Sequence, residues 1–564
     1  MQATVPTPWI KTLEGVRKTN IEFEDITTLD MVHRRAITQP QEFSMIFAVG
    51  KKGVTYQELW ESIKSLAVFL KSVGIEKGDR VCVLLPNTPH YVISHYAIMA
   101  AGAVVVQGNP LYTEKELTDQ LNDCDAKGVI SLTLFQDKVN KVMKNTSVEF
   151  VILGKISDYM KPIISFLGKL LKKLDDPSLK SLPNNYSFKK ALKSPSDRYQ
   201  KLVMDLDDVA LLQYTGGTTG RSKGATLTHR NLSFNAQQIR ELVPTVPDNA
   251  GPVLTVLPLF HSFALTCCLG ISIRAGCPMI LMPKFDAGDA LKFIEKYKVI
   301  FAPSVPTMMI ALLNHPNFAR TDMSSLIASI SGGAALPIEV ANQFAEIANV
   351  DVIEGYGLSE TSPVVTGNPL GSDKVKPKSG SIGLPAANTL IKIVDQDDYN
   401  KDMPQGEAGE IAINGPQVMV GYWNDPESTK TAIKDGWLLT GDIGYMDEEG
   451  YFFIVDRKKD IIIVSGNNVV PRDVEEVLYA HPAVLEAAVA GVPHPSKGEM
   501  VAAWIVLKEG MTASEEEIIK FCAERLAPYK IPKLVIFKED LPKTMIGKIL
   551  RRALKEDYAA SKSS

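Results

Sequence analysis

The chain has 564 residues, roughly three times the length of a typical domain, so more than one domain is expected. Its 61 basic and 65 acidic residues leave a formal charge of -4, which argues against a strongly basic chain built to bind nucleic acid. A hydrophobic content of 45% and aperiodic glycine and proline exclude collagen-like and low-complexity proteins.

The cysteines and the apolar stretches indicate in which cellular compartment the protein is expected. The six cysteines form no Cys-x-x-Cys pair, which is typical of a chain kept in a reducing compartment. Residues 1–14 contain no apolar core of the length that a signal peptide needs. The longest apolar stretches, 91–106 and 265–282, are interrupted by His95 and Arg274 and are better explained as buried elements than as membrane spans. We therefore expect a cytoplasmic protein.

Strands and helices are expected to alternate through much of the chain. Short apolar runs that predict strands are each followed by a stretch that predicts a helix. The clearest pairs are Arg80–Leu85 with Tyr91–Ala101, Gly128–Leu132 with Leu134–Met143, and Val299–Ala302 with Thr307–Leu313. Such alternation is typical of βαβ units and parallel sheets. The polar, proline-containing segment Asp175–Arg198 is expected to be a surface excursion between elements.

One segment combines apolar and basic residues. Tyr159–Leu174 places its apolar side chains near helical spacing, and Lys169, Lys172 and Lys173 lie beside them. This pattern suits a helix that lies in a membrane interface. A surface helix packed on its own domain explains the pattern as well, so peripheral membrane contact is a hypothesis.

The pattern changes near residue 390. Short strands separated by turn signals are expected at Ile391–Val394, Gly409–Ile413, Tyr451–Ile454 and Ile461–Val464. Helices are then expected at Pro471–Ala480 and Ser514–Leu526, and strands at Val484–Gly491 and Met500–Leu507. We predict an α/β protein with a large N-terminal domain at 1–458, built from parallel βαβ-type sheets and a small β-rich subdomain at 390–458. A small, mobile α+β C-terminal domain follows at 459–564.

A loop rich in glycine and threonine follows the apolar segment 211–214. It contains Thr215, Gly216, Gly217, Thr218, Thr219, Gly220, Arg221, Ser222, Lys223 and Gly224. Glycines allow a tight turn that directs several N–H donors at one anion, while hydroxyls and a lysine add donors and positive charge. The spacing is not that of a Walker A loop. We expect this loop to bind the phosphates of a nucleotide.

This loop closely resembles the signature loop of the adenylate-forming superfamily, which includes acyl-CoA synthetases, luciferase and peptide-synthetase adenylation domains. Ser222 departs from the pattern, because many members have proline there. The resemblance covers nearly the whole chain in the family's order. The other matching motifs are Leu257–Ser262, Ser331–Ala334, Glu354–Thr361, Thr440–Asp442, Asp456–Asp460 with Ser465 and Gly466, and Pro542–Lys548.

The resemblance implies that ATP and Mg²⁺ are bound by these motifs. The implied ATP- and AMP-binding residues are Thr215, Gly216, Gly217, Thr218, Thr219, Gly220, Lys223, Gly332, Gly333, Ala334, Glu354, Gly355, Tyr356, Gly357, Ser359, Asp442, Arg457 and Lys548. Tyr356 would stack on adenine, and Asp442 and Arg457 would bind the ribose. Glu360, with Thr215, would hold Mg²⁺, a hard ion that prefers oxygen ligands.

The resemblance also implies three catalytic residues: Lys548, Glu360 and His261. Lys548 would reach the substrate carboxylate and the α-phosphate, where positive charge offsets the repulsion between two anions. His261 would line the acid pocket as a mobile gate. The small domain would rotate about a hinge at Lys459, and Gly466 would lie along the channel for coenzyme A. Some relatives place a thioester-step lysine where this chain has Ile463.

The segment Phe260–Leu269 is apolar and contains small residues, so we expect a hydrophobic and roomy acid pocket. The hinge and C-terminal motifs are most similar to those of long-chain fatty acid:CoA ligases. We therefore expect a ligase that joins a fatty acid to coenzyme A through an acyl-AMP intermediate, with ATP and CoA as co-substrates. The alternatives are an aryl-acid (coumarate-type) or medium-chain ligase, a carrier-protein ligase, a luciferase-type oxidase and a degenerate nucleotide or acyl sensor. The sequence is compatible with a homodimer but does not establish the oligomeric state.

Overall fold

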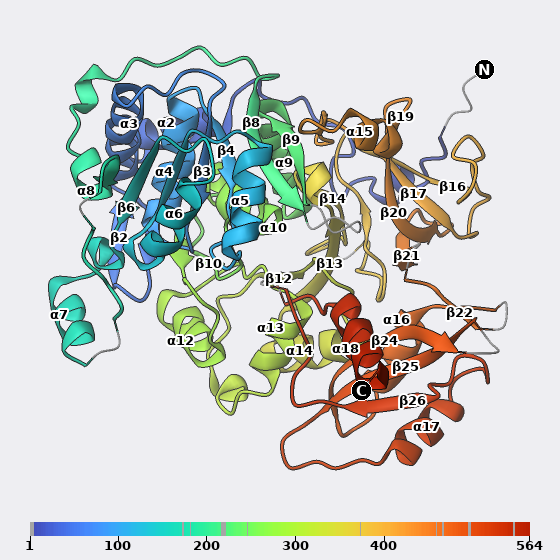
Figure 1. Ribbon diagram of the computed structural model, residues 1–564. Helices are drawn as coiled ribbons and strands as arrows, with labels where there is room; N and C mark the ends of the chain where they lie inside the picture. The colour runs from blue at the N-terminus through green and yellow to red at the C-terminus, as the bar shows by residue number, and fades with distance from the viewer. Residues whose placement is uncertain are drawn as a thin grey trace.

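The computed structural model describes residues 5–171, 174–180, 182–215, 222–244, 246–372, 374–457, 460–464, 467–494, 498–544 and 547–563. The described chain forms a large N-terminal part and a smaller C-terminal part, the orange-red to red region at the lower right of Figure 1. Mixed sheets flanked by helices make up both parts, which confirms the predicted α/β class.

An eight-stranded sheet fills one side of the large part. In spatial order its strands are β18 (Gly421–Tyr422), β9 (Lys223–Thr228), β8 (Val209–Thr215), β4 (Val104–Gln107), β3 (Arg80–Leu84), β5 (Gly128–Leu132), β6 (Phe150–Gly154) and β7 (Asn185–Ser187). The strands from β8 to β7 are parallel, as the βαβ alternation predicts. β9 and β18 add antiparallel pairs at one edge.

The apolar strands of this sheet are buried on both faces. In β3, Val81 and Val83 belong to one core cluster, whereas Cys82 and Leu84 belong to another, because successive side chains of a strand point to opposite faces. Helices α3 (Tyr56–Ser72) and α4 (Pro89–Ala100) supply side chains to the first cluster. Helices α5 (Glu114–Asp123) and α6 (Gln136–Met143) supply the second. This is the burial expected of a parallel sheet with helices on both faces.

Two four-stranded sheets continue the large part. Their strands are β10 (Val253–Thr255), β11 (Met279–Leu281), β1 (Phe43–Phe47) and β2 (Lys52–Thr55), and β12 (Ala328–Ser331), β13 (Asp351–Gly357), β14 (Val364–Gly367) and β15 (Leu384–Pro385). The strand predicted at 299–302 is reduced to isolated bridges, in which Phe301 pairs with Val253 on one side and Ala328 on the other. Phe301 thereby links the two sheets.

Helix α9 (His229–Leu242) runs through the large part and is buried along most of its length. Its polar side chains hold loops from distant parts of the chain. Asn235 donates to the carbonyl of Val364 at 2.8 Å, and Gln238 donates to that of Ala387 at 2.6 Å. Buried polar groups are tolerated when they are hydrogen-bonded in this way. The last turn of α9 carries Ile239 and Leu242, which line the cavity described below.

The predicted β-rich region contains β16 (Leu390–Val394), β17 (Gly409–Asn414), β19 (Ile433–Lys434), β20 (Trp437–Met446) and β21 (Phe452–Arg457). Trp9 from the N-terminal end packs on Phe452 of this sheet, with ring centroids 5.8 Å apart. Strand β21 is longer than predicted and includes Asp456 and Arg457, which were expected between strands. These two charged residues are therefore held in a fixed register opposite Ile443 and Asp442.

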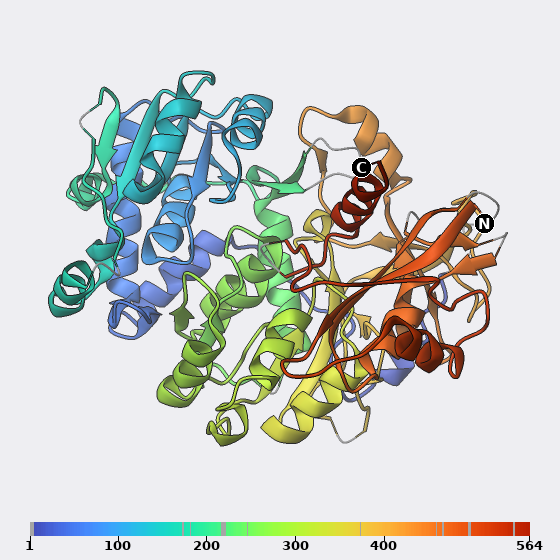
Figure 2. The ribbon, with the colours of Figure 1, turned by 60° about the horizontal axis from the view of Figure 1, so that its bottom comes forward.

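The small part is an α+β unit. Its strands are β22 (Ile462–Val464), β23 (Asn467–Val469), β24 (Val484–His494), β25 (Gly498–Leu507) and β26 (Leu534–Phe537), and its helices are α16 (Pro471–Tyr479), α17 (Glu515–Ala523) and α18 (Arg551–Ser563). β24 and β25 form a long antiparallel pair around which the helices pack. Figure 2 shows this unit lying against the green and yellow segments of the large part.

The remaining helices complete the large part. They are α1 (Trp9–Thr12), α2 (Thr28–Thr38), α7 (Pro162–Leu170), α8 (Phe188–Ala191), α10 (Ser262–Ala264), α11 (Ile271–Ala275), α12 (Ala287–Tyr297), α13 (Pro306–Leu313), α14 (Ile338–Ala348) and α15 (Pro426–Ala432). The predicted surface excursion 175–198 contains the edge strand β7 and helix α8, so it belongs partly to the sheet. Across the described ranges, no helix has the length and apolar character needed to cross a membrane.

Candidate active site

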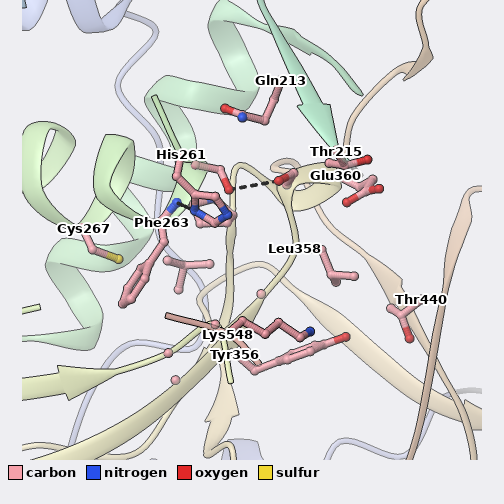
Figure 3. Close-up of a pocket in the computed structure, with 18 of the residues that line it drawn as sticks. Gln213, Thr215, His261, Phe263, Cys267, Tyr356, Leu358, Glu360, Thr440 and Lys548 are labelled. Atoms are coloured by element: carbon pink, nitrogen blue, oxygen red, sulfur yellow. Dashed lines mark hydrogen bonds between the residues drawn. The ribbon is translucent and has the colours of Figure 1, made fainter. Parts of the chain in front are cut away.

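A cavity of about 740 Å³ lies between the large part and the small part. The large part supplies the ends of β8 and β13 and the segment 260–267, and the small part supplies Thr544 and Lys548. In the view of Figure 3, Gln213, His261 and Glu360 lie along the upper side of the cavity, and Tyr356 and Lys548 lie along the lower side. Residues far apart in the sequence therefore meet at one place.

Most of the described residues that the sequence singled out line this cavity. They are Thr215, Lys223, His261, Gly332, Gly333, Gly355, Tyr356, Gly357, Ser359, Glu360, Arg457 and Lys548. Ala334, Glu354 and Asp442 are not among the lining residues. Gly216, Gly217, Thr218, Thr219, Gly220, Lys459 and Gly466 lie outside the described residues.

Glu354 lies in β13, next to the lining residue Gly355, and its side chain is 10% exposed. Its carboxylate accepts a hydrogen bond from the backbone N–H of Leu336 at 3.4 Å and lies 4.0 Å from Arg472 of the small part. Burial raises the pKa of Glu354 to about 7, because the charged form is poorly solvated there. The backbone oxygen of Glu354 accepts a hydrogen bond from Asn368. In this structure the side chain of Glu354 thus supports the wall and a contact between the two parts.

The carboxylate of Glu360 faces a cluster of polar groups. The hydroxyl of Tyr422 donates to Glu360 Oε1 at 2.8 Å, and the backbone N–H of Met419 donates to the backbone oxygen of Glu360 at 2.8 Å. Lys223 Nζ lies 5.3 Å from the ring centre of Tyr422 and donates to Ser428 at 2.7 Å. Tyr422 therefore sits between the loop lysine and the carboxylate and holds both in place.

Tyr356 and Arg457 converge on Asp442. The hydroxyl of Tyr356 donates to Asp442 Oδ2 at 2.6 Å, and Arg457 Nε lies 3.2 Å from Asp442 Oδ1. Register explains the second contact, because Asp442 and Arg457 are paired residues of β20 and β21. The Asp442 side chain is only 7% exposed, so a partner on each oxygen offsets the cost of burying its charge.

Lys548 is the main basic group that the small part brings to the cavity. Its backbone N–H donates to the hydroxyl of Thr544 at 3.1 Å, and its backbone oxygen accepts from the N–H of Thr544 at 2.8 Å. Gly547 has a φ of +74°, and a Cβ atom there would lie 2.0 Å from the hydroxyl oxygen of Thr307 in the large part. Only glycine therefore permits this close approach.

Burial changes how the basic groups of the cavity titrate. Burial and, to a lesser extent, the nearby positive charge of Arg457 lower the pKa of Lys548 to about 8, whereas Asp442 acts in the opposite direction. Burial likewise lowers the pKa of His261 to about 4, with a smaller contribution from Lys548. His261 is therefore neutral at pH 7, and its Nδ1 accepts a hydrogen bond from the N–H of Phe263 at 3.3 Å.

One arm of the cavity is apolar. It is lined by Ile239, Leu242, Phe263, Cys267, Ile330, Ile353 and Val364. Cys267 belongs to a single π-helical stretch, Leu265–Gly270, whose wider turn interrupts the helix beside the cavity. Such a wall suits a hydrocarbon group, as expected for the segment 260–269.

Sequence analysis did not identify Tyr422, Gln107 or Gln213. Gln107 is the last residue of β4, Gln213 lies two residues before the end of the neighbouring parallel strand β8, and both line the cavity. Among the described residues, Gln107 Nε2 and Gln213 Oε1 are buried without a hydrogen-bond partner. A polar residue near the end of an apolar strand was the available signal for Gln213. The sequence contained no signal for Tyr422, because the residues that it contacts, Glu360 and Lys223, are distant from it in the sequence.

Comparison with known proteins assigns this arrangement to a family. A family profile described as AMP-binding enzyme matches residues 32–423, more than half of the chain. A second profile, AMP-binding enzyme C-terminal domain, matches residues 473–548. The chain belongs to the AMP-binding enzyme family. The resemblance to adenylate-forming enzymes is thereby confirmed, and the two profiles fall on the large and small parts of the structure.

Individual relatives in the AMP-binding enzyme family cover nearly the full chain. A long-chain-fatty-acid–CoA ligase of Bacillus subtilis is 42% identical over 553 residues, covering 98% of both chains. A 4-coumarate–CoA ligase of Petroselinum crispum is 34% identical, covering 90% of this chain and 89% of its own. The solved structure of an anthranilate CoA ligase in complex with anthranoyl-AMP has a TM-score of 0.84 and 26% identity, covering 95% of this chain and 98% of its own.

The lowered pKa of Lys548 predicts a pH-dependent affinity for AMP. Below about pH 8 Lys548 carries a positive charge that attracts a phosphate, and above that pH the charge is lost. We expect the dissociation constant for AMP, measured by isothermal titration calorimetry, to rise by up to about tenfold between pH 7 and pH 9. The Lys548→Ala variant should bind AMP more weakly at pH 7 and show no comparable rise. An equal rise in this variant would assign the titration to another group.

Proposed function

We propose that this chain is an ATP-dependent long-chain fatty acid:CoA ligase. The observation that carries the proposal is one cavity that joins an apolar arm to Thr215, Lys223 and Glu360 of the large part and to Lys548 of the small part. Near full-length similarity to a long-chain-fatty-acid–CoA ligase at 42% identity supports the same assignment. Intact Thr215, Lys223, Glu360, Asp442 and Lys548 argue against a degenerate sensor.

The reaction has two steps that share the cavity. In the first, a carboxylate oxygen of the acid bonds to the α-phosphorus of ATP, and the bond to pyrophosphate breaks. Lys548 would offset the repulsion between these two anions, and electrostatic stabilisation of this kind is usually the largest catalytic contribution. In the second, the thiol of CoA loses its proton to solvent, its sulfur bonds to the acyl carbon, and the acyl C–O bond breaks so that AMP leaves with the bonding electrons. No general base is needed on the acid, which is ionised at pH 7, in agreement with a neutral His261 that acts as a gate.

The nucleotide would lie across the wall formed by residues 332–360. Tyr356 would provide a flat apolar face for adenine between Gly355 and Gly357, whose lack of side chains permits close approach. Asp442 and Arg457, which already contact each other, would bind the ribose hydroxyls. The phosphates would lie toward Thr215 and Lys223. The backbone of the loop that follows Thr215 would supply further donors.

The residues around Glu360 fit a magnesium ion. Glu360 presents a carboxylate to the cavity beside the hydroxyl of Thr215, and its Oε1 is oriented by Tyr422. Among the described residues no cluster of three or more acidic, histidine or cysteine side chains could hold a metal alone. Mg²⁺ commonly binds through one or two carboxylates together with water and substrate phosphates, so this sparse donor set is suitable. When bound, the ion would neutralise phosphate charge.

The two steps also require different arrangements of the small domain. Lys548 occupies the cavity in this structure, which corresponds to the first step. We propose that the domain boundary lies at 458/459, that the domain turns about Lys459, and that Gly466 then borders the channel for the long thiol of CoA. A homodimer remains a prediction from the resemblance.

The proposed function is tested by pyrophosphate release with ATP and Mg²⁺ across C4 to C18 fatty acids and several cinnamates. We expect a maximum among the long chains, because the apolar arm gains affinity with each buried methylene, about 0.8 kcal/mol. Sustained turnover should require CoA. The Lys548→Ala variant should lose about 100- to 1000-fold in rate, whereas Ala at the exposed Lys533 should have no effect.

The outcomes of this assay separate the alternatives. A maximum among cinnamates would leave the mechanism unchanged and assign an aryl-acid ligase. That result would agree with the similarity to the coumarate ligase. A maximum near C8 would assign a medium-chain ligase. No release with any acid would contradict the proposal and favour a sensor.

We further propose that helix α7 contacts a membrane surface. Its apolar side chains point to solvent: Ile163, Phe166, Leu167, Leu170 and the following Leu171 are between 44% and 66% exposed. On the other side, Ile164 packs against the main core. Figures 1 and 2 show α7 projecting at the left edge of the molecule. A stripe at i, i+3, i+4, i+7 and i+8 normally faces a core, so its exposure indicates a partner that is itself apolar.

Basic residues flank this stripe. The N–H of Lys161 donates to the carbonyl of Gly50 at 3.0 Å, which brings the turn containing Lys51 and Lys52 beside the start of α7. All three lysines are exposed. An apolar helix with such a rim suits a bilayer containing anionic lipids, where each lysine near the surface contributes about 1 kcal/mol. A fatty acid dissolved in that bilayer would then be close to the enzyme.

Vesicle co-sedimentation tests this contact. The unmodified protein should sediment with vesicles that contain phosphatidylglycerol, and the double variant Phe166→Ser with Leu170→Ser should lose about tenfold or more in affinity, because two large side chains no longer enter the bilayer. Val203→Ser, at a position 95% exposed, is the matched control and should bind normally. Binding that is unchanged in the double variant would contradict the proposal.

A further inference from the structure

Arg551, the first residue of α18, is surrounded by three carboxylates. Its Nη2 lies 2.9 and 2.8 Å from the two oxygens of Glu475, and its Nη1 lies 3.1 Å from Asp456 Oδ1 and 3.7 Å from Asp460 Oδ2. The side chains of Arg551, Glu475 and Asp456 are 22%, 16% and 6% exposed. Ion pairs this buried fix the geometry of the groups that they join, since breaking one leaves an uncompensated charge.

These carboxylates come from different parts of the molecule. Asp456 lies in β21, which pairs with β20 of the large part, and its backbone is held opposite Ile443. Glu475 lies in α16 of the small part, where its carboxylate also accepts from the N–H of Val489 at 2.8 Å. Arg551 therefore connects the small part to the strand that also carries Arg457, a residue of the cavity wall.

The chain between Lys548 and Arg551 is short and constrained. Lys543 and Ile549 form a bridge, and the N–H of Leu550 donates to the carbonyl of Pro542 at 2.8 Å, so the segment that carries Lys548 is a closed loop. Only two residues, Ile549 and Leu550, separate Lys548 from Arg551. A shift of Arg551 away from β21 must consequently move Lys548 relative to the cavity.

We infer that Arg551 is a positioning residue that holds Lys548 in the cavity for acyl-AMP formation and is not needed once the acyl-AMP exists. The inference rests on the proposed function. Asp456 is on the large part and Glu475 is on the small part, so the bridge through Arg551 depends on how the two parts are arranged. A reorientation of the small part that opens a path for CoA would separate Arg551 from Asp456. Arg551 itself does not line the cavity and is not a catalytic residue.

Separate assays of the two half-reactions test this role. In Arg551→Ala we expect palmitate-dependent exchange between ATP and pyrophosphate to fall by about 100-fold, because a misplaced catalytic group loses about that much. The conversion of supplied palmitoyl-AMP and CoA to palmitoyl-CoA should change less than about twofold, since positioning for the first step no longer matters. Arg551→Lys should restore part of the exchange, because an ammonium keeps the charge but cannot bridge two carboxylates as a guanidinium does.

Arg552→Ala is the matched control. Arg552 is the next residue of the same helix, its side chain is 71% exposed, and its ion pair is with Glu556 one turn along α18. Both half-reactions should be unaffected, because exposed pairs of this kind contribute little.

A second variant separates positioning from folding. Asp456→Asn keeps the size of the side chain, removes the charge that Arg551 pairs with, and should lower exchange selectively by about tenfold. Equal loss of both half-reactions in both variants would reduce the cluster to a structural role and overturn the inference, as would unchanged exchange in Arg551→Ala. If the unmodified enzyme performs neither half-reaction, the proposed function fails instead.

Discussion

The structure depends on placing one ammonium group in a cavity where it is largely buried. Burial that lowers the pKa of Lys548 to about 8 costs free energy, because a charged lysine is poorly solvated there. The same desolvation makes its charge more effective on an anion, since Coulomb interactions strengthen as the local dielectric falls. Lys548 is carried on the separate small part, and the close contact between Gly547 and Thr307 of the large part places it in the cavity.

The large part supplies groups that are already held in place within its own sheets. Tyr356, Asp442 and Arg457 are fixed by hydrogen bonds and strand register, and Glu360 is fixed by Tyr422. Preorganised dipoles and charges of this kind stabilise developing charge without reorganising during the reaction. In the proposed mechanism, the division between a prepared large part and an inserted lysine would let the second step, which needs a long thiol, use the same cavity after a turn of the small part.

The sequence predicted the parallel sheet well, because apolar strands buried on both faces produce continuous hydrophobic runs such as those of β3 and β5. It predicted a strand at 299–302 that the structure reduces to bridges at Phe301, since apolar runs of four residues do not specify pairing. Most of the described residues that the family resemblance singled out line the cavity. Tyr422 was missed because its role depends on Lys223 and Glu360 meeting in space, and Arg551 because a basic terminal helix is usually a solvated surface.

The most direct test of the account follows the oxygen atoms of the acid. Palmitate carrying ¹⁸O in both carboxylate oxygens is incubated with ATP, Mg²⁺ and CoA, and the AMP is isolated for mass spectrometry. If a carboxylate oxygen bonds to the α-phosphorus, each AMP that is formed carries one ¹⁸O atom. Unlabelled AMP, or label in ADP or inorganic phosphate, would show that no acyl-AMP forms and would contradict the role assigned to Lys548.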